Sequence, residues 1–164
     1  MTETYMTEES IQKLIAENVA KASALSALPI PLVDSIGSVV IQVKMIEKLA
    51  NIHNVRIDNR QSILISSIVT AAVTSLIALA INQLTTNTKF EKLLGEALVK
   101  ATLVSITTTA MGELYHHHFK HGGTVDDLTF ETVMDYIERQ MSSDRLSISN
   151  LSDELVEGMM DRFG

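Results

Sequence analysis

The chain of 164 residues contains no cysteine. This absence excludes a disulfide framework, a zinc-thiolate site, an iron–sulfur cluster and a thiol nucleophile, and it is compatible with a reducing compartment. The first nine residues carry glutamates but no lysine or arginine, so they lack the positive and apolar regions of a secretory signal. We therefore expect a protein that faces the cytosol.

Positive charge is scarce, because 13 lysines and arginines stand against 20 acidic residues and leave a net charge of −7. Residues 1–120 are neutral, with ten acids and ten basic residues, whereas residues 121–164 hold ten acids against three arginines. An acidic segment repels phosphate backbones, and no basic stripe elsewhere offsets it. The composition therefore predicts no binding of nucleic acid.

Catalytic and nucleotide-binding motifs are also missing from the sequence. There is no Gly-x-x-x-x-Gly-Lys-[Ser/Thr] loop to hold phosphates, and no acid–base or nucleophile pair occurs at usable spacing. His53 has no carboxylate or serine arrangement around it, which favours a surface or core-edge histidine. We expect neither an enzyme nor a cofactor.

The densest polar cluster lies between Glu113 and His121. If a helix continues through it, Glu113, His117 and His121 share one face at spacings that let side chains converge on a metal ion. The simpler interpretation is that imidazoles near a helix C-terminus interact favourably with its dipole, and a third is a pH-responsive interface. We predict no metal site and keep these three residues as weak candidates.

The two prolines of the chain divide its first half. A hydroxyl cap at Thr7, followed by two glutamates, predicts a first helix over residues 8–27. Pro29 and Pro31 end it, and Pro31 is suited to open a second helix that continues to about residue 50. A polar break is expected over residues 51–59.

No charged residue occurs between Arg60 and Lys89, and 14 of the 19 residues at 63–81 are apolar. This segment contains neither glycine nor proline, which predicts one uninterrupted helix in the centre of the structure. It is long enough to cross a bilayer, but its serines and threonines also allow a buried core helix. Small and hydroxyl residues at helical spacing predict close approach of a neighbouring helix or contact with a membrane. The candidate residues are Ile63, Ser67, Thr70, Ala71, Thr74, Ala78 and Ile81.

The segment from Phe90 to Tyr115 is again apolar with helical period, and we expect it to be the second arm of a helical hairpin. After Gly122 and Gly123 the sequence becomes acidic and amphipathic. We therefore predict an all-α helical bundle with a central hydrophobic hairpin in residues 1–123. Residues 124–164 form an acidic helical tail, which is expected to be a cap or docking element.

Gln42 and Lys44 interrupt the apolar stretch of the second helix. One interpretation places both on a solvated face. The other has the Gln42 amide bonding across a helix interface, where it can satisfy itself in apolar surroundings.

Four segments of the sequence resemble the domain-of-unknown-function 697 family over roughly residues 14–122. They are Ala24-Leu-Ser-Ala-Leu-Pro29-Ile-Pro31-Leu-Val-Asp34, Ile41-Gln42-Val-Lys44-Met45-Ile, Leu49-Ala-Asn-Ile-His-Asn-Val55 and Gly112-Glu-Leu-Tyr115. The signature residues are Pro29, Pro31, Asp34, Gln42, Lys44 and Met45.

The family is helical, often fused to bacterial GTPase domains and regarded as membrane-associated. No GTPase domain is present here, so the resemblance implies a membrane-facing module, with a separate GTPase as a partner in trans. We expect it at the cytoplasmic side of a bacterial inner membrane. The alternative is a cytoplasmic helical bundle that forms a homo-oligomeric structural or adaptor protein.

Overall fold

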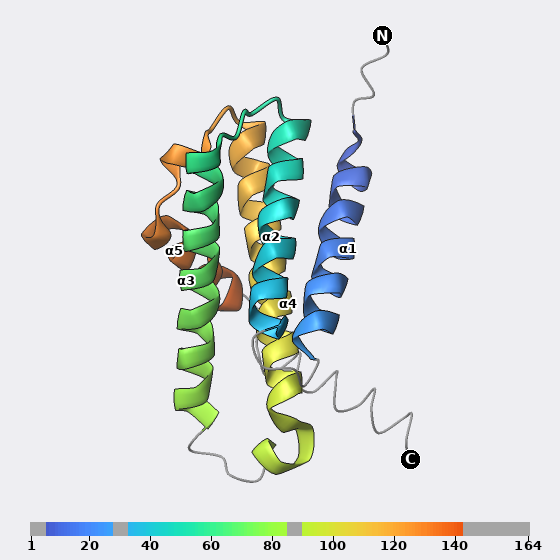
Figure 1. The fold of residues 1–164 in the computed structure, drawn as a ribbon, viewed down its shortest axis with the longest axis vertical. Helices are drawn as coiled ribbons and strands as arrows, with labels where there is room; N and C mark the ends of the chain where they lie inside the picture. Colours follow the sequence, from blue (N-terminus) through green and yellow to red (C-terminus); the bar gives the residue numbers. More distant parts are fainter. Residues whose placement is uncertain (1–5, 28–32, 85–89, 143–164) are drawn as a thin grey trace.

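The computed structural model describes residues 6–27, 33–84 and 90–142; within its helices it describes the side chains of residues 6–27, 36–76 and 100–140. The described residues form five α-helices and one short 3-10 helix packed as a bundle, with no strand among them (Figure 1). The elements are α1 (Glu8–Ser26), α2 (Val33–Ile52), α3 (Asn59–Leu84), α4 (Phe90–Lys120), η1 (Val125–Asp127) and α5 (Phe130–Ser142). The predicted helical bundle is confirmed.

The helix boundaries follow from local chemistry. At the start of α1 the Thr7 hydroxyl accepts a hydrogen bond from the backbone N–H of Ser10 at 3.2 Å, as the cap pattern predicts. Asp58 and Gln61 form a reciprocal cap at the start of α3, each side chain accepting from the other's backbone N–H at 2.9 and 3.1 Å. Asn54, in the turn that follows α2, has a left-handed backbone conformation with φ 57°.

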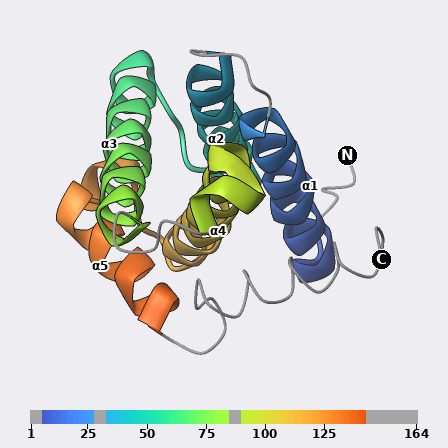
Figure 2. The same cartoon turned by 90° about the horizontal axis from the view of Figure 1, so that it is seen from below.

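The long uncharged segment is one helix, because α3 runs without a break across residues 63–81 as predicted. Of the two arms of the hairpin, however, α4 occupies the centre of the bundle. Figures 1 and 2 show α1, α2, α3 and α5 arranged around it, with α2 and α3 side by side on one side. The second arm is also longer than expected, since α4 continues past Tyr115 to Lys120.

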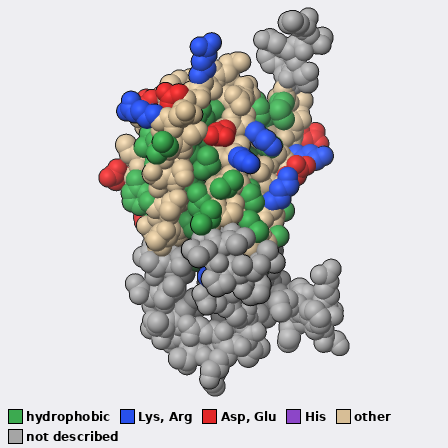
Figure 3. All heavy atoms as spheres, in the orientation of Figure 1, with side chains coloured by type: hydrophobic (Ala, Val, Ile, Leu, Met, Phe, Trp, Pro, Cys, Tyr) green, Lys and Arg blue, Asp and Glu red, His purple; other side chains and the backbone are tan. Residues whose placement is uncertain are grey.

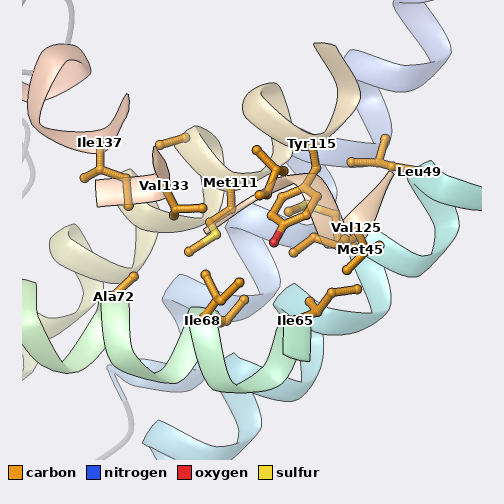
Figure 4. Close-up of a cluster of buried hydrophobic side chains, with 14 of the residues drawn as sticks. Met45, Leu49, Ile65, Ile68, Ala72, Met111, Tyr115, Val125, Val133 and Ile137 are labelled. Carbon is orange, nitrogen blue, oxygen red and sulfur yellow. The ribbon is translucent and has the colours of Figure 1, made fainter. Parts of the chain in front are cut away.

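One hydrophobic core joins α1, α2, α3, α4, η1 and α5, and Figure 4 shows its middle. Tyr115 and Met111 from α4, Met45 of α2 and Ile65 of α3 point into it, and all four are fully buried. The core extends beyond residue 123, through residues of η1 and α5 and the loop between them. These residues are Val125, Leu128, Val133 and Ile137. The first part of the acidic tail therefore covers the bundle, and the predicted second tail helix and linker lie outside the described residues.

Helix α1 packs antiparallel to α4, and the two helices approach each other closely. Contacts at both ends define this arrangement: Glu8 reaches His116, and the Ser23 hydroxyl donates to the carbonyl of Ala101 at 3.2 Å. Between them, a Cβ at Gly112 would lie 2.8 Å from Cγ2 of Ile15. The missing side chain of Gly112 thus permits the close contact.

Candidate interaction surface of α2 and α3

The outer face of α3 is exposed and uncharged over the described part of the stripe that the sequence singled out. Ser67, Thr70 and Thr74 are exposed, Ile63 is 68% exposed, and Ala71 is half-buried. The side chains of Ala78 and Ile81 lie outside the described residues. The stripe is therefore turned away from α4, and the expectation that the next helix packs along it is not met.

Two hydroxyl groups on this face, those of Ser67 and Thr70, bond to the helix itself. Ser67 Oγ donates to the carbonyl of Ile63 at 2.9 Å, and Thr70 Oγ1 donates to the carbonyl of Ser66 at 2.7 Å. Such i−4 bonds satisfy the hydroxyl without water. The face can therefore enter a low-dielectric environment at less cost than its serine and threonine content suggests.

Helix α2 continues this surface with two exposed aliphatic residues. Ile36 is 61% and Val40 is 44% exposed, and they lie one helical turn apart. The register between the helices is fixed by Ser62, whose hydroxyl donates to Glu47 Oε1 at 2.5 Å. Because α2 and α3 are antiparallel, this register brings Ile36 and Val40 to the level of Thr74 and Thr70.

The exposed charges on this surface are basic, while the acidic Glu47 is half-buried. Among the described side chains of α2 and α3, the exposed charged residues are Lys44, Lys48 and Arg60, and all three are basic. Figure 3 shows this side of the molecule, where hydrophobic and uncharged surface extends below two central Lys or Arg side chains. We call the outer faces of α2 and α3, from Ile36 to Lys48 and from Arg60 to Thr74, the α2–α3 surface.

None of the helices has, over its described residues, both the length and the apolar character needed to cross a membrane. Of the two alternatives left open for residues 63–81, the bilayer span finds no support in the described residues.

The family-signature residues have separate positions. Gln42 is fully buried, and its Nε2 donates to Thr108 Oγ1 of α4 at 2.7 Å, so the cross-helix interpretation of Gln42 is right and the solvated one is wrong. Lys44 is exposed, as the solvated interpretation expected, and Met45 is fully buried in the core. The prolines at 29 and 31, and the side chain of Asp34, lie outside the described residues.

The weak metal candidates do not converge. The His117 and His121 rings are stacked 4.2 Å apart, and His121 Nδ1 donates to the carbonyl of His117 at 2.7 Å. Glu113 instead accepts from the hydroxyl of Tyr136 at 3.5 Å. Within residues 6–27, 33–84 and 90–142, no group of three potential ligands could hold a metal ion.

Sequence reasoning missed a polar network at the other ends of these helices. His53 Nε2 lies 2.9 Å from His116 Nδ1, and His116 Nε2 lies 2.9 Å from Glu8 Oε1. Lys120 Nζ donates to Glu8 Oε2, also at 2.9 Å. The core-edge position expected for His53 agrees with its half-buried state, and its contact with the His116 imidazole was not predicted. No local signal could have revealed this network, because its members come from three helices.

Comparison with known proteins gives one match. The family model described as Domain of unknown function (DUF697) matches residues 5–145. No curated protein and no solved structure matches the chain. The matched range covers most of the sequence and includes every described helix from α1 to α5. This chain therefore belongs to the DUF697 family.

Proposed function

We propose that the protein is a non-catalytic helical module that attaches to a membrane surface through the α2–α3 surface, without crossing the bilayer. The observation that carries the proposal is the uncovered outer face of α3, where aliphatic and hydroxyl side chains stand without charge from Ile63 to Thr74. The basic residues beside this face suit anionic lipid headgroups, although the chain as a whole carries −7.

The expected strength of attachment follows from the residues involved. Burying the exposed parts of Ile36, Val40 and Ile63, which are 61%, 44% and 68% exposed, contributes on the order of 3–5 kcal/mol. Each lysine or arginine near an anionic surface adds about 1 kcal/mol. The summed free energy of attachment is similar to that of a single acyl chain, which binds a membrane reversibly. We therefore propose weak, salt-sensitive association with the cytoplasmic face of a bacterial inner membrane.

A flotation assay tests the proposal with vesicles of phosphatidylcholine, with and without phosphatidylglycerol. The wild type is expected to float with the anionic vesicles and to detach at high salt. Thr70→Glu introduces a charge on the α2–α3 surface and should weaken binding at least roughly tenfold, a loss of about 1.4 kcal/mol. Ala20→Glu makes the same change at an exposed position of α1 and should bind as the wild type does.

Other results would contradict the proposal or favour the homo-oligomeric alternative. A wild type that stays with neither kind of vesicle, or two variants that bind alike, contradicts membrane attachment. If Thr70→Glu instead lowers the mass measured by light scattering, the surface joins copies of the chain, which is the homo-oligomeric alternative. The family resemblance alone supports a GTPase as partner in trans, and co-purification with a candidate GTPase tests it.

A further inference from the structure

The polar network of Glu8, His53, His116 and Lys120 connects the ends of three helices. Glu8 lies in the first turn of α1, His116 and Lys120 in the last turns of α4, and His53 directly after α2. His116 is only 5% exposed, whereas the side chains of Glu8 and Lys120 are 55% and 51% exposed. The two imidazoles therefore meet at the edge of the core, with the charged groups outside them.

Hydrogen-bond chemistry limits how many protons the pair can hold. The carboxylate of Glu8 accepts, so His116 Nε2 carries a hydrogen and donates. In neutral His116 the other nitrogen, Nδ1, has a lone pair and accepts from Nε2–H of His53. One added proton is tolerated on the outer nitrogen of His53. A second added proton puts hydrogens on both facing nitrogens, which then repel each other across 2.9 Å.

We propose that His53 and His116 form a pH-sensitive latch, which holds the corner after α2 against the end of α4 near neutral pH and opens when both rings are protonated. This inference does not depend on the proposed membrane function.

The surroundings of His53 support the direction of the effect. Its pKa is lowered from the ordinary value of 6.5, first by burial and then by the charges of His116 and Lys120, while Glu8 opposes the shift. These are the groups whose charges reach His53, from α4 and from α1. Because the unfolded chain then binds more protons than the folded one, stability falls as pH drops below about 6.5.

Glu8 titrates in a separate range. The Lys120 and His116 hydrogen bonds lower the pKa of its carboxyl from 4.5 to about 2. Its contribution to stability is therefore complete above pH 4.5 and is lost only as pH falls from there toward 2. A change between pH 7 and 5 is thus not attributable to this carboxylate.

The latch would release only a local segment. The corner over residues 53–58 leads directly into α3, and Gln61 at the start of that helix stays bound, because its Nε2 donates to Asp126 Oδ2 at 2.8 Å. The core cluster of α2, α3 and α4 contains no aspartate, glutamate, lysine, arginine or histidine. We expect the corner to open while the bundle stays folded.

Hydrogen exchange of the full chain, corrected for the intrinsic pH effect on exchange, tests this inference. Amide protection over residues 52–58 should fall at least tenfold between pH 7.5 and 5.5 in the wild type. His53→Gln retains an N–H that can donate to His116 but cannot take up a proton, so its protection should change less than threefold. His117→Gln removes an exposed histidine outside the latch and should behave as the wild type does.

A second measurement keeps the inference testable if His53→Gln does not fold. In wild-type NMR spectra, the ring signals of His53 should change over the same pH range in which the amide protection of residues 52–58 is lost. Protection that does not change with pH in the wild type, or an equal loss in His53→Gln, would overturn the latch. So would ring signals of His53 that change over a different pH range from the loss of protection.

Discussion

Helices α1 and α3 both pack one face into the core and leave the other uncovered, yet their outer faces differ in kind. The exposed positions of α1 include Glu9, Lys13, Glu17 and Lys21, a mixture of both signs. Over the same length, the outer face of α3 carries aliphatic and hydroxyl groups and, beyond Arg60, no charge. Alternating charges keep α1 solvated, whereas the face of α3 loses little on leaving water. Helical periodicity thus identifies the buried face of each helix, while the charge content of the opposite face indicates what that face contacts.

The largest expected loss of stability comes from placing a charge on the buried face of α3 and not on its exposed face. Val73 is 6% exposed in the core, so Val73→Asp buries an unpaired charge and should cost about 4 kcal/mol or more, enough to prevent stable folding. Thr70→Asp places the same charge on the exposed face and should leave the thermal midpoint within a few degrees. Circular dichroism melting compares them. Equal melting of the two variants would mean that the faces are wrongly assigned.

One flank of α3 is covered by α5, and removing that cover should have the next largest effect. Truncation after Gly123 takes away Val125, Leu128, Val133 and Ile137, each contributing roughly 1.5–3 kcal/mol when buried. Released chain entropy offsets part of this, so we expect a net loss of several kcal/mol. Chemical denaturation measures it, with truncation after Ser142 as the control that retains α5. A chain ending at Gly123 that is as stable as the control would show that η1 and α5 are dispensable.

The close contact of α1 with α4 predicts a smaller loss. Gly112→Ala adds a Cβ within 2.8 Å of Ile15, and relieving the overlap should cost about 1–3 kcal/mol. In an Ile15→Ala background the space is already open, so the same change should cost much less. A double-mutant cycle by denaturation gives the coupling. Additive effects of the two substitutions would mean that the strain caused by Gly112→Ala does not come from contact with Ile15.

Much of the fold follows from the sequence because its signals are local. The Thr7 cap, the prolines and the lack of glycine and proline at 63–81 predict α1, the following break and an unbroken α3. The sequence does not reveal which apolar helix is central, because α3 and α4 are both apolar enough to be buried at the centre of the bundle. That choice is made by packing: α4 is contacted by helices on several sides, whereas α3 keeps one face exposed.

Features that depend on distant residues could not be predicted. The change in charge after Gly123 suggested an acidic tail distinct from the hydrophobic domain of residues 1–123. Charge reports only the outer face of α5, however, and Val133 and Ile137 on its inner face enter the core. The contact of His53 with His116 joins residues 63 apart along the chain, and nothing near either residue indicates the other.

The smallest change in stability is predicted for Gln42, a buried polar residue whose hydrogen bonding differs from that of the exposed hydroxyls of α3. The hydroxyls on the α3 surface bond to their own helix, whereas buried Gln42 satisfies only its Nε2, and its Oε1 has no hydrogen-bond partner among the described residues. Gln42→Leu removes this unsatisfied oxygen and keeps a similar volume. Thr108 loses one donor, but its hydroxyl still donates to the carbonyl of Val104 at 2.6 Å. Since an unmade buried hydrogen bond costs about 1–3 kcal/mol, the substitution should be neutral or slightly stabilising.

Gln42→Glu is the matched control, because it keeps the shape of the side chain but places a carboxyl where the amide donated to Thr108. It should be destabilising by several kcal/mol near neutral pH, since among the described residues Gln42 is bonded to the Thr108 hydroxyl and to no cation that could neutralise a buried carboxylate. Urea denaturation of both variants measures the difference. A clear loss of stability in Gln42→Leu would mean that the cross-helix bond outweighs the unsatisfied oxygen, and that α2 and α4 depend on this amide for their register.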